Sequence, residues 1–356
     1  MQQNIEATLE KLVAIPSTSY NPDTCREVIE FVRSEIEPLG LFIHSDMDRP
    51  NPWLLATTQN TPAPATVLAA HLDVAPASPN LFGVRRDHDK LYGRGVFDMK
   101  FAAACYIEFA KAHAALLPTL DIGFFFTTDE EISGASVAEL VDGGWHPGRV
   151  LIPDGGKDWQ IEERAKGFYG AQLTATGKNA HGSRPWEGKN AVHNLMDILT
   201  ALRQEWPVKG VNDATFSVTG LTGGSDVFNQ IPDTATALID FRTFSTEELT
   251  AFTAQLTSLA AERDIIVTII QTGEPVAFDK TSPAVQDFLE ALHAVRGEAP
   301  NYTVSYGGTD ARHFAKANIP TIIVVPRGGE LHGDGEWILA EDLDVFYQLL
   351  VRWLVK

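Results

Sequence analysis

The stretch Gly123–Ile132, with the sequence GFFFTTDEEI, constrains the fold of this chain more than any other. It begins as an apolar run and ends in three consecutive acids, Asp129, Glu130 and Glu131. A buried strand that delivers carboxylates at its C-terminal end is typical of the place where an open α/β sheet carries its chemistry. The stretch therefore predicts either an acidic functional site or an ordinary solvated loop between a strand and a helix.

Two other apolar runs end in a similar way. Thr66–Leu72 (TVLAAHL) contains His71 and leads to Asp73, and Val150–Pro153 is followed by Asp154. Short continuous apolar runs fit strands that are buried on both faces of a parallel sheet. Because such strands end at the same edge of the sheet, we expect these side chains to lie near the three consecutive acids.

Two more candidates lie outside these runs. Asp98 belongs to a glycine-rich segment, LYGRGVFDMK (91–100), and His332 follows a very apolar strand predicted at 321–325. The GRG glycines suggest a phosphate-binding loop only weakly, because the rest of that glycine pattern is missing. A mixture of histidine and carboxylate without thiolate suits Zn²⁺, Mn²⁺ or Co²⁺ better than Ca²⁺ or Mg²⁺.

The patterning changes near residue 165, which predicts an inserted domain. Residues 166–274 have strand and helix patterns in the order β-α-β-β-α-β, the order of a ferredoxin-like domain. The flanking residues 1–165 and 275–356 are predicted to form one α/β domain. Helices are predicted at 3–13, 22–37, 100–115, 190–206, 246–261, 282–295, 310–316 and 340–355.

Charge and composition limit the kinds of partner. The formal charge of −19 argues against a nucleic-acid partner, which would require a basic face. The N-terminal sequence lacks the pattern of a signal peptide, and no stretch approaches the roughly 20 apolar residues of a membrane span. Cys25 and Cys105 are isolated, so they suggest neither a disulfide framework nor a thiolate zinc site. We therefore expect a cytoplasmic protein with a small-molecule substrate.

At this point a resemblance to a known family becomes specific. The motifs that carry it occur in the expected order and approximate spacing: HLDVAP (71–76), LYGRGVFDMK (91–100), TTDEE (127–131), KNAHGSRPWEGKNAV (178–192), GGTDAR (307–312) and the late His332. Together they resemble the dinuclear zinc exopeptidases and deacylases, which include desuccinylases, deacetylases, aminoacylases, dipeptidases and carboxypeptidases. The resemblance covers nearly the whole chain. It implies a three-layer catalytic domain on a zinc-exopeptidase-like mixed sheet, interrupted by a lid and dimerisation domain.

The resemblance implies two metal sites that share one ligand. His71, Asp98 and Asp154 would bind one zinc ion, and Asp98 would bridge to a second ion held by Glu131 and His332. Co²⁺ and Mn²⁺ are possible substitutes for zinc.

The same resemblance implies catalytic roles. Glu130 would be the general base, and Asp73 would orient the ring of His71. His181 would stabilise the oxyanion, within its own subunit or across a homodimer. The peptide bond after Asp98 is expected to be cis.

Three residues match substrate-binding positions of the family. They are Asn229 in FNQIPD, Arg242 in DFRT and Arg312 in GGTDAR. Arginine suits a bidentate contact with a carboxylate. An asparagine in a turn and arginines in ion pairs are the competing interpretations.

The predicted function is that of a metal-dependent hydrolase that cleaves an amide bond in a small N-acyl amino acid. Asp154 stands where the deacylases and carboxypeptidases of the family usually carry glutamate, and aspartate there is more usual among its aminopeptidases and dipeptidases. The first alternative is therefore a peptidase of the same family, namely a dipeptidase, aminopeptidase or carboxypeptidase. A single-metal hydrolase is the second. A non-catalytic binding protein on the same fold is the third, although no expected ligand or base is missing.

Overall fold

The computed structural model describes residues 1–224 and 227–355, which form two compact units. The first unit consists of Met1–Glu163, Ala277–Ser305 and Thr309–Lys356, and the inserted unit of Arg164–Val276 and Tyr306–Gly308. The short piece Tyr306–Gly308 was expected in the first unit, but Nη1 of Arg242 donates to the Tyr306 carbonyl (3.4 Å). That the inserted unit acts as a lid and dimerises stays a prediction.

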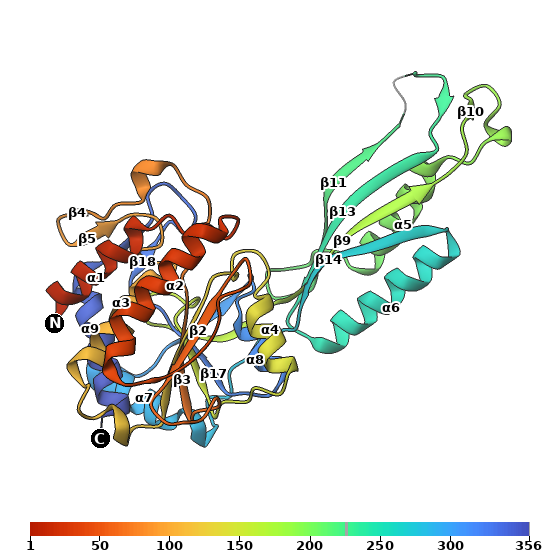
Figure 1. The fold of residues 1–356 in the computed structure, drawn as a ribbon. Helices are drawn as coiled ribbons and strands as arrows, with labels where there is room; N and C mark the ends of the chain where they lie inside the picture. Colours follow the sequence, from red (N-terminus) through yellow and green to blue (C-terminus); the bar gives the residue numbers. More distant parts are fainter. Residues whose placement is uncertain (225–226, 356) are drawn as a thin grey trace. The chain divides into compact units, whose positions relative to one another are not determined.

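A six-stranded mixed sheet forms the centre of the first unit (Figure 1). The strands run in the order β1-β2-β6-β3-β7-β17; β6, β3, β7 and β17 are parallel, and β1 and β2 are antiparallel at one edge. Their bounds are β1 Phe42–Asp46, β2 Trp53–Thr57, β3 Thr66–His71, β6 Ile122–Thr127, β7 Val150–Ile152 and β17 Thr321–Ile323. Every residue of the four parallel strands is buried, which explains their continuous apolar sequence. The predicted α/β fold with a mixed sheet is confirmed.

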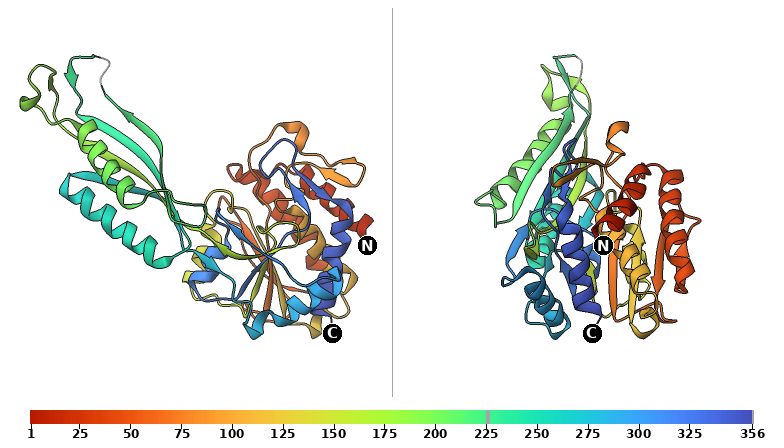
Figure 2. Two further views of the ribbon diagram at one scale, coloured as in Figure 1. Left: turned by 180° about the vertical axis from the view of Figure 1, so that it is seen from behind. Right: turned by 90° about the vertical axis from the view of Figure 1, so that its left-hand side faces the viewer.

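Helices cover the sheet on both sides. Figure 1 shows α1, α2, α3 and α9 on one side, and α4 and α8 on the other. A further helix, α7, packs on α9. The bounds of these helices are α1 Gln2–Ala14, α2 Pro22–Ile36, α3 Lys100–Ala112, α4 Ala135–Asp142, α7 Pro283–Arg296, α8 Ala311–Lys316 and α9 Ala340–Leu354. The two chain ends belong to α1 and α9, and Figure 2 shows both on the first unit. Asn21-Pro22 has the sequence pattern of a cap followed by proline at the first helical position, and the Asn21 side chain does accept from the Thr24 N–H (3.4 Å).

The inserted unit contains a four-stranded antiparallel sheet with α5 and α6 packed on it. The strand order is β11-β13-β9-β14, which is that of the predicted ferredoxin-like arrangement. Its elements are β9 Gly167–Thr176, β10 Ala180–His181, α5 Ala191–Glu205, β11 Thr215–Gly223, β12 Gln230–Ile231, β13 Thr234–Thr243, α6 Thr246–Glu262 and β14 Ile265–Gly273. Alternate residues of the strands face the helices, and the stacked rings of Phe241 and Phe252 (4.0 Å between centroids) lie in this core.

The structure departs from the predicted elements at several places, and β1, β2 and α4 were not predicted. Helix α3 ends at Ala112 rather than near 115, because the following His113 packs against Phe109 and its Nε2 lies 3.1 Å from the Tyr347 hydroxyl. Strand β8, Ile161–Ala165, was not predicted and joins a small sheet with β15 Val276–Ala277 and β16 Tyr302–Ser305.

A further departure concerns the start of α6, where Ser245-Thr-Glu-Glu248 has the sequence pattern of a capping box. Ser245 caps the helix by accepting from the Glu248 N–H, but the Glu248 carboxylate accepts from the Thr243 hydroxyl instead of completing a capping box. A further short sheet of the first unit has the order β18-β19-β5-β4, with β18 Gly328–Gly329, β19 Trp337–Leu339, β5 Lys90–Tyr92 and β4 Arg85–Asp87. Among the described residues, no helix is long and apolar enough to cross a membrane.

Candidate metal centre

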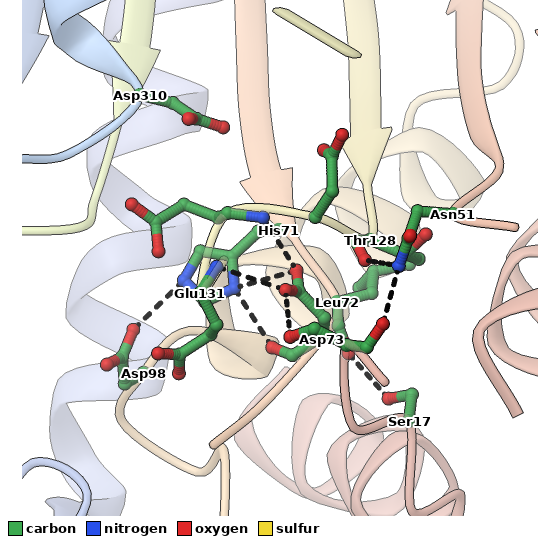
Figure 3. A network of polar contacts seen from close by, with 12 residues as sticks. Ser17, Asn51, His71, Leu72, Asp73, Asp98, Thr128, Glu131 and Asp310 are labelled. Carbon is green, nitrogen blue, oxygen red and sulfur yellow. Dashed lines mark hydrogen bonds and ion pairs between the residues drawn. The ribbon is translucent and has the colours of Figure 1, made fainter. Parts of the chain in front are cut away.

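The parallel strands bring the predicted site residues to one edge of the central sheet. Strand β3 ends at His71, and the acids Glu130 and Glu131 follow the end of β6. Asp154 comes two residues after β7. Figure 3 shows Glu131 near His71 and Asp98 at this edge. Strand order alone therefore assembles a set of histidine and carboxylate groups that are far apart in the sequence.

The carboxylate of Asp98 lies between two histidines. Its Oδ1 is 3.0 Å from Nε2 of His71, and its Oδ2 is 3.2 Å from Nε2 of His332. Nε2 of His332 is also 3.0 Å from Oε2 of Glu131. The candidate ligand atoms form two groups, each within 4.8 Å, namely His71 with Asp98 and Asp154, and Asp98 with Glu131 and His332. We call these the inner and the outer group.

The two histidines are held in an electronegative environment. Burial alone would lower the pKa of His71, but hydrogen bonds with Asp73 and Asp98 raise it well above the usual value. Hydrogen bonds to Asp98 and Glu131 raise the pKa of His332 to about 10. Burial alone would raise the pKa of Asp98, but its contacts with the two histidines lower it. In each of these contacts a proton lies between an imidazole nitrogen and a carboxylate oxygen. A divalent cation could bind the same two atoms, so this donor set fits metal ions.

For two other acids of the site, the charge of His71 offsets the effect of burial only in part. Burial raises the pKa of Glu130 well above its usual value, and the nearby Asp154 raises it further. Burial and the charge of Asp98 raise the pKa of Asp154 in the same way. Crowded carboxylates repel one another in a low-dielectric site, and cations relieve that repulsion.

Asp73 connects the strand that carries His71 to the loop that carries the acids (Figure 3). Its fully buried carboxylate accepts from the N–H groups of Glu130 (3.3 Å) and Glu131 (3.1 Å). Nδ1 of His71 is 3.0 Å from the Asp73 carbonyl oxygen but 3.5 Å from its carboxylate. The ring is thus oriented mainly by the main chain of Asp73, while the side chain fixes the acid loop.

Two residues that the sequence did not single out support this arrangement. The Ser19 hydroxyl donates to Oδ2 of Asp73 (2.7 Å), across 54 residues of sequence. The Asn51 side chain donates to the carbonyl oxygens of Ser19 (2.8 Å) and Thr128 (2.7 Å), the latter visible in Figure 3. Both lie in connecting segments, where hydrophobic periodicity carries no signal.

Arg312 lies beneath the acid loop. Its side chain is only 3% exposed, and Nη2 donates to the Ser133 carbonyl (2.7 Å). The neighbouring Asp310 lines the small cavity that Glu130 and Asp154 also line, and burial raises the pKa of Asp310 to about 7. Gly134 has a φ of +60°, and a Cβ there would lie 1.8 Å from Asp310, so glycine is required at this turn. Nη2 of Arg312 also lies 3.8 Å from Oδ1 of Asp310, and the predicted substrate contact of Arg312 stays a prediction.

The other predicted residues belong to the inserted unit. Nδ1 of His181 accepts from the Ser183 N–H (3.2 Å). The side-chain amide of Asn229 lies 3.2 Å from Nε2 of the same ring. Arg242 binds Asp240 through Nε (2.9 Å) and Nη2 (3.0 Å), so an internal carboxylate occupies its guanidinium. The catalytic and substrate-binding roles of these residues stay predictions.

A fold with two ligand groups that share a carboxylate at the ends of parallel strands defines a class of candidate two-metal hydrolases. Its peptide bond Asp98–Met99 is cis, as expected from the resemblance. Residues 67–356 match the family model described as peptidase family M20/M25/M40. The chain therefore belongs to this family of metallohydrolases, which act on amide or peptide bonds.

Individual relatives agree with this assignment. The chain is 29% identical over 354 residues to a succinyl-diaminopimelate desuccinylase of Pseudomonas syringae, with 90% of this chain and 88% of the relative covered. Among solved structures, a tripeptidase of Staphylococcus aureus has a TM-score of 0.81 at 20% identity, covering 99% of this chain and 98% of the other. A dinuclear metal-binding peptidase of Bacillus subtilis has a TM-score of 0.71 at 18% identity, covering 99% and 97%. The two structures show a shared fold.

The turn after Asp154 depends on one buried acid. Glu162 is 1% exposed, its Oε2 accepts from the Gly156 N–H (2.9 Å), and burial raises its pKa to about 7. The pKa of this acid is higher in the folded protein than in the unfolded chain, so the unfolded chain releases the proton first. The folded protein therefore loses stability as the pH rises from about 4.5 to about 7. Glutamine removes this ionisation and keeps an oxygen for Gly156.

We therefore predict that Glu162→Gln raises the free energy of unfolding at pH 8 by roughly 1–3 kcal/mol and changes it little at pH 5. Urea unfolding at the two pH values, in chelator, measures the difference. Glu163→Gln, which removes a neighbouring acid bonded to Lys280 (2.9 Å), should stay within about 0.5 kcal/mol at both. Equal destabilisation of Glu162→Gln at both pH values would contradict the assignment.

Proposed function

We propose that this protein is a two-metal amidohydrolase that removes the acyl group of a small N-acyl amino acid. The position of Asp98 carries the proposal, since each of its oxygens faces a different histidine, His71 or His332. One carboxylate placed in this way is suited to bridge two cations about 3.5–4 Å apart. A single-metal hydrolase would not need the second histidine.

The donor set favours zinc. It combines imidazole nitrogen with carboxylate oxygen and contains no thiolate, which suits Zn²⁺ and also Co²⁺ or Mn²⁺. His71, Asp98 and Asp154 would hold one ion, and Asp98, Glu131 and His332 the other. When bound, such ions supply Lewis acidity to a carbonyl and lower the pKa of water.

Glu130 and Glu131 would divide the remaining work. Oε2 of Glu131 lies against His332, whereas within residues 1–224 and 227–355 no histidine lies within ion-pair distance of the Glu130 carboxylate. Glu130 would accept the proton of the attacking water and return it to the leaving amine. Asp73 would hold both glutamates through their backbone N–H groups.

His181 would supply a hydrogen-bond donor to the developing oxyanion. Its Nδ1 accepts from the Ser183 N–H, so the donor would have to be Nε2, which faces the side-chain amide of Asn229 (3.2 Å). We propose that it acts in its own subunit or in the partner of a homodimer formed through the inserted unit. A mass measurement in solution that gives a monomer would remove the dimer from this proposal.

The division of labour between the two glutamates predicts different losses. Glu130→Gln should keep two metal ions per chain and lower kcat by about 10²–10⁴-fold, because only the proton acceptor is removed. Glu131→Gln should bind the outer metal far more weakly. Metal analysis together with kcat on one substrate measures both effects.

The matched control is Glu139→Gln, which changes an exposed acid paired with Arg49 (2.8 Å) and should alter neither quantity. Equal loss of metal in the Glu130 and Glu131 variants would show that the division of labour is wrong.

The substrate class rests on the named relatives. Succinyl-diaminopimelate desuccinylases align with about nine-tenths of this chain, which supports an N-acyl amino acid. Asp154 supports a dipeptidase or aminopeptidase instead, because the family resemblance places aspartate there more often in those members than in deacylases or carboxypeptidases.

A panel of N-succinyl and N-acetyl amino acids against dipeptides, with Zn²⁺ or Co²⁺ supplied, separates these alternatives. We predict that kcat/KM for the best N-acyl substrate exceeds that for any dipeptide by at least about tenfold. A preference for dipeptides would establish the peptidase alternative. Metal binding without hydrolysis of any member would favour the non-catalytic binding protein.

A further inference from the structure

The carboxylate of Glu336 occupies an anion-binding turn of the main chain. Its Oε1 accepts from three N–H groups, those of Gly95 (2.9 Å), Phe97 (3.0 Å) and Asp98 (3.1 Å). Successive backbone N–H groups that point inwards form a concave site for anions. The GRG segment therefore binds an anion, but the anion is a side chain of the protein itself.

Arg94 connects this turn to the segment that carries His332. Its Nη1 donates to Oε2 of Glu336 (2.7 Å), and its Nη2 donates to the His332 carbonyl oxygen (2.8 Å), 238 residues away in the sequence. Arg94 and Glu336 are each 2% exposed. A guanidinium can make both bonds at once because its donors form a rigid planar fork.

Both ends of this link require support. His332 has a φ of +59°, which is unfavourable for a residue other than glycine, and its side chain is 54% exposed. Gly95 has a φ of +85°, and a Cβ there would lie 2.9 Å from the Val74 side chain. Residues in such conformations persist where surrounding contacts fix them. The bonds of Arg94 and Glu336 are contacts of this kind.

We propose that Arg94 and Glu336 are positioning residues that set the separation of Asp98 from His332 and thereby the affinity of the outer metal position. Neither residue touches a ligand atom of the two groups; each acts through the main chain. The inference rests on the proposed function, in which these groups bind metal ions.

The outer position depends on this link more than the inner one does. Asp98 and His332, two of the three outer ligands, are attached to it, and only Glu131 is held separately, through Asp73. In the inner group, His71 is oriented by Asp73, and Asp154 follows a different strand. Loss of the link should therefore weaken metal binding at one position preferentially.

The test titrates chelator-treated protein with Zn²⁺ and follows both binding events by calorimetry, with Co²⁺ absorption as a second readout. Glutamine has one accepting oxygen where glutamate has two, so Glu336→Gln can accept from the N–H groups of the turn or from Arg94, but not from both. We expect its outer dissociation constant to rise roughly 10–100-fold and its inner constant to stay within about threefold. Arg94→Lys, which keeps the charge but lacks the fork, should act in the same direction.

Asp287→Asn is the matched control. It removes a carboxylate that accepts from Nη2 of Arg149 (3.0 Å) and Nε1 of Trp353 (3.1 Å). Arg149 precedes β7, whereas Asp154 follows it, so this carboxylate belongs to the other end of the strand. Its two metal affinities should equal those of the wild type. Near-ultraviolet circular dichroism checks the fold of each variant. If Glu336→Gln does not fold, the metal affinities of Arg94→Lys test the proposal.

Unchanged affinities in the folded Arg94 or Glu336 variants would overturn the proposal, as would equal weakening of both positions. Loss of the outer metal in Asp287→Asn would also overturn it, because an ion pair remote from the turn would then have the same effect. Failure of the wild type to bind two ions would instead refute the proposed function.

Discussion

The repulsion among carboxylates at one edge of a buried sheet is the constraint on which the rest of the structure depends. Three parallel strands, β3, β6 and β7, deliver His71, Glu130, Glu131 and Asp154 to the same place, and burial raises the pKa of Glu130 and Asp154. The chain offsets part of this repulsion with backbone N–H groups, which bind the carboxylates of Asp73 and Glu336. Cations are the natural complement for the remaining negative charge.

The contacts around this site form two separate supports. Asp73, Ser19 and Asn51 connect the N-terminal loops, β3 and the acid loop, and so fix His71, Glu130 and Glu131. Arg94 and Glu336 connect the turn before α3 with the segment after β18, and so fix Asp98 and His332. Mutations in one support should therefore have consequences that differ from mutations in the other.

Much of the architecture was predictable because its signals are local. Continuous apolar runs identified β3, β6 and β7, and Asn21-Pro22 identified the start of α2. The supports were not predictable in this way. The partners of Arg94 and Asp73 lie tens to hundreds of residues away, and neither periodicity nor spacing indicates which main-chain groups a buried side chain will bind. The bond from Arg312 to the Ser133 carbonyl was not predictable either, because the two residues are 179 positions apart.

The sharing of Asp98 between two metal ions is the central claim, and anomalous diffraction at the zinc edge from zinc-loaded crystals tests it most directly. We predict two peaks about 3.5–4 Å apart. One peak should lie within ligand distance of His71 and Asp154. The other peak should lie within ligand distance of Glu131 and His332, and Asp98 should contact both. A single peak, or two peaks that do not share Asp98, would contradict the two-metal site.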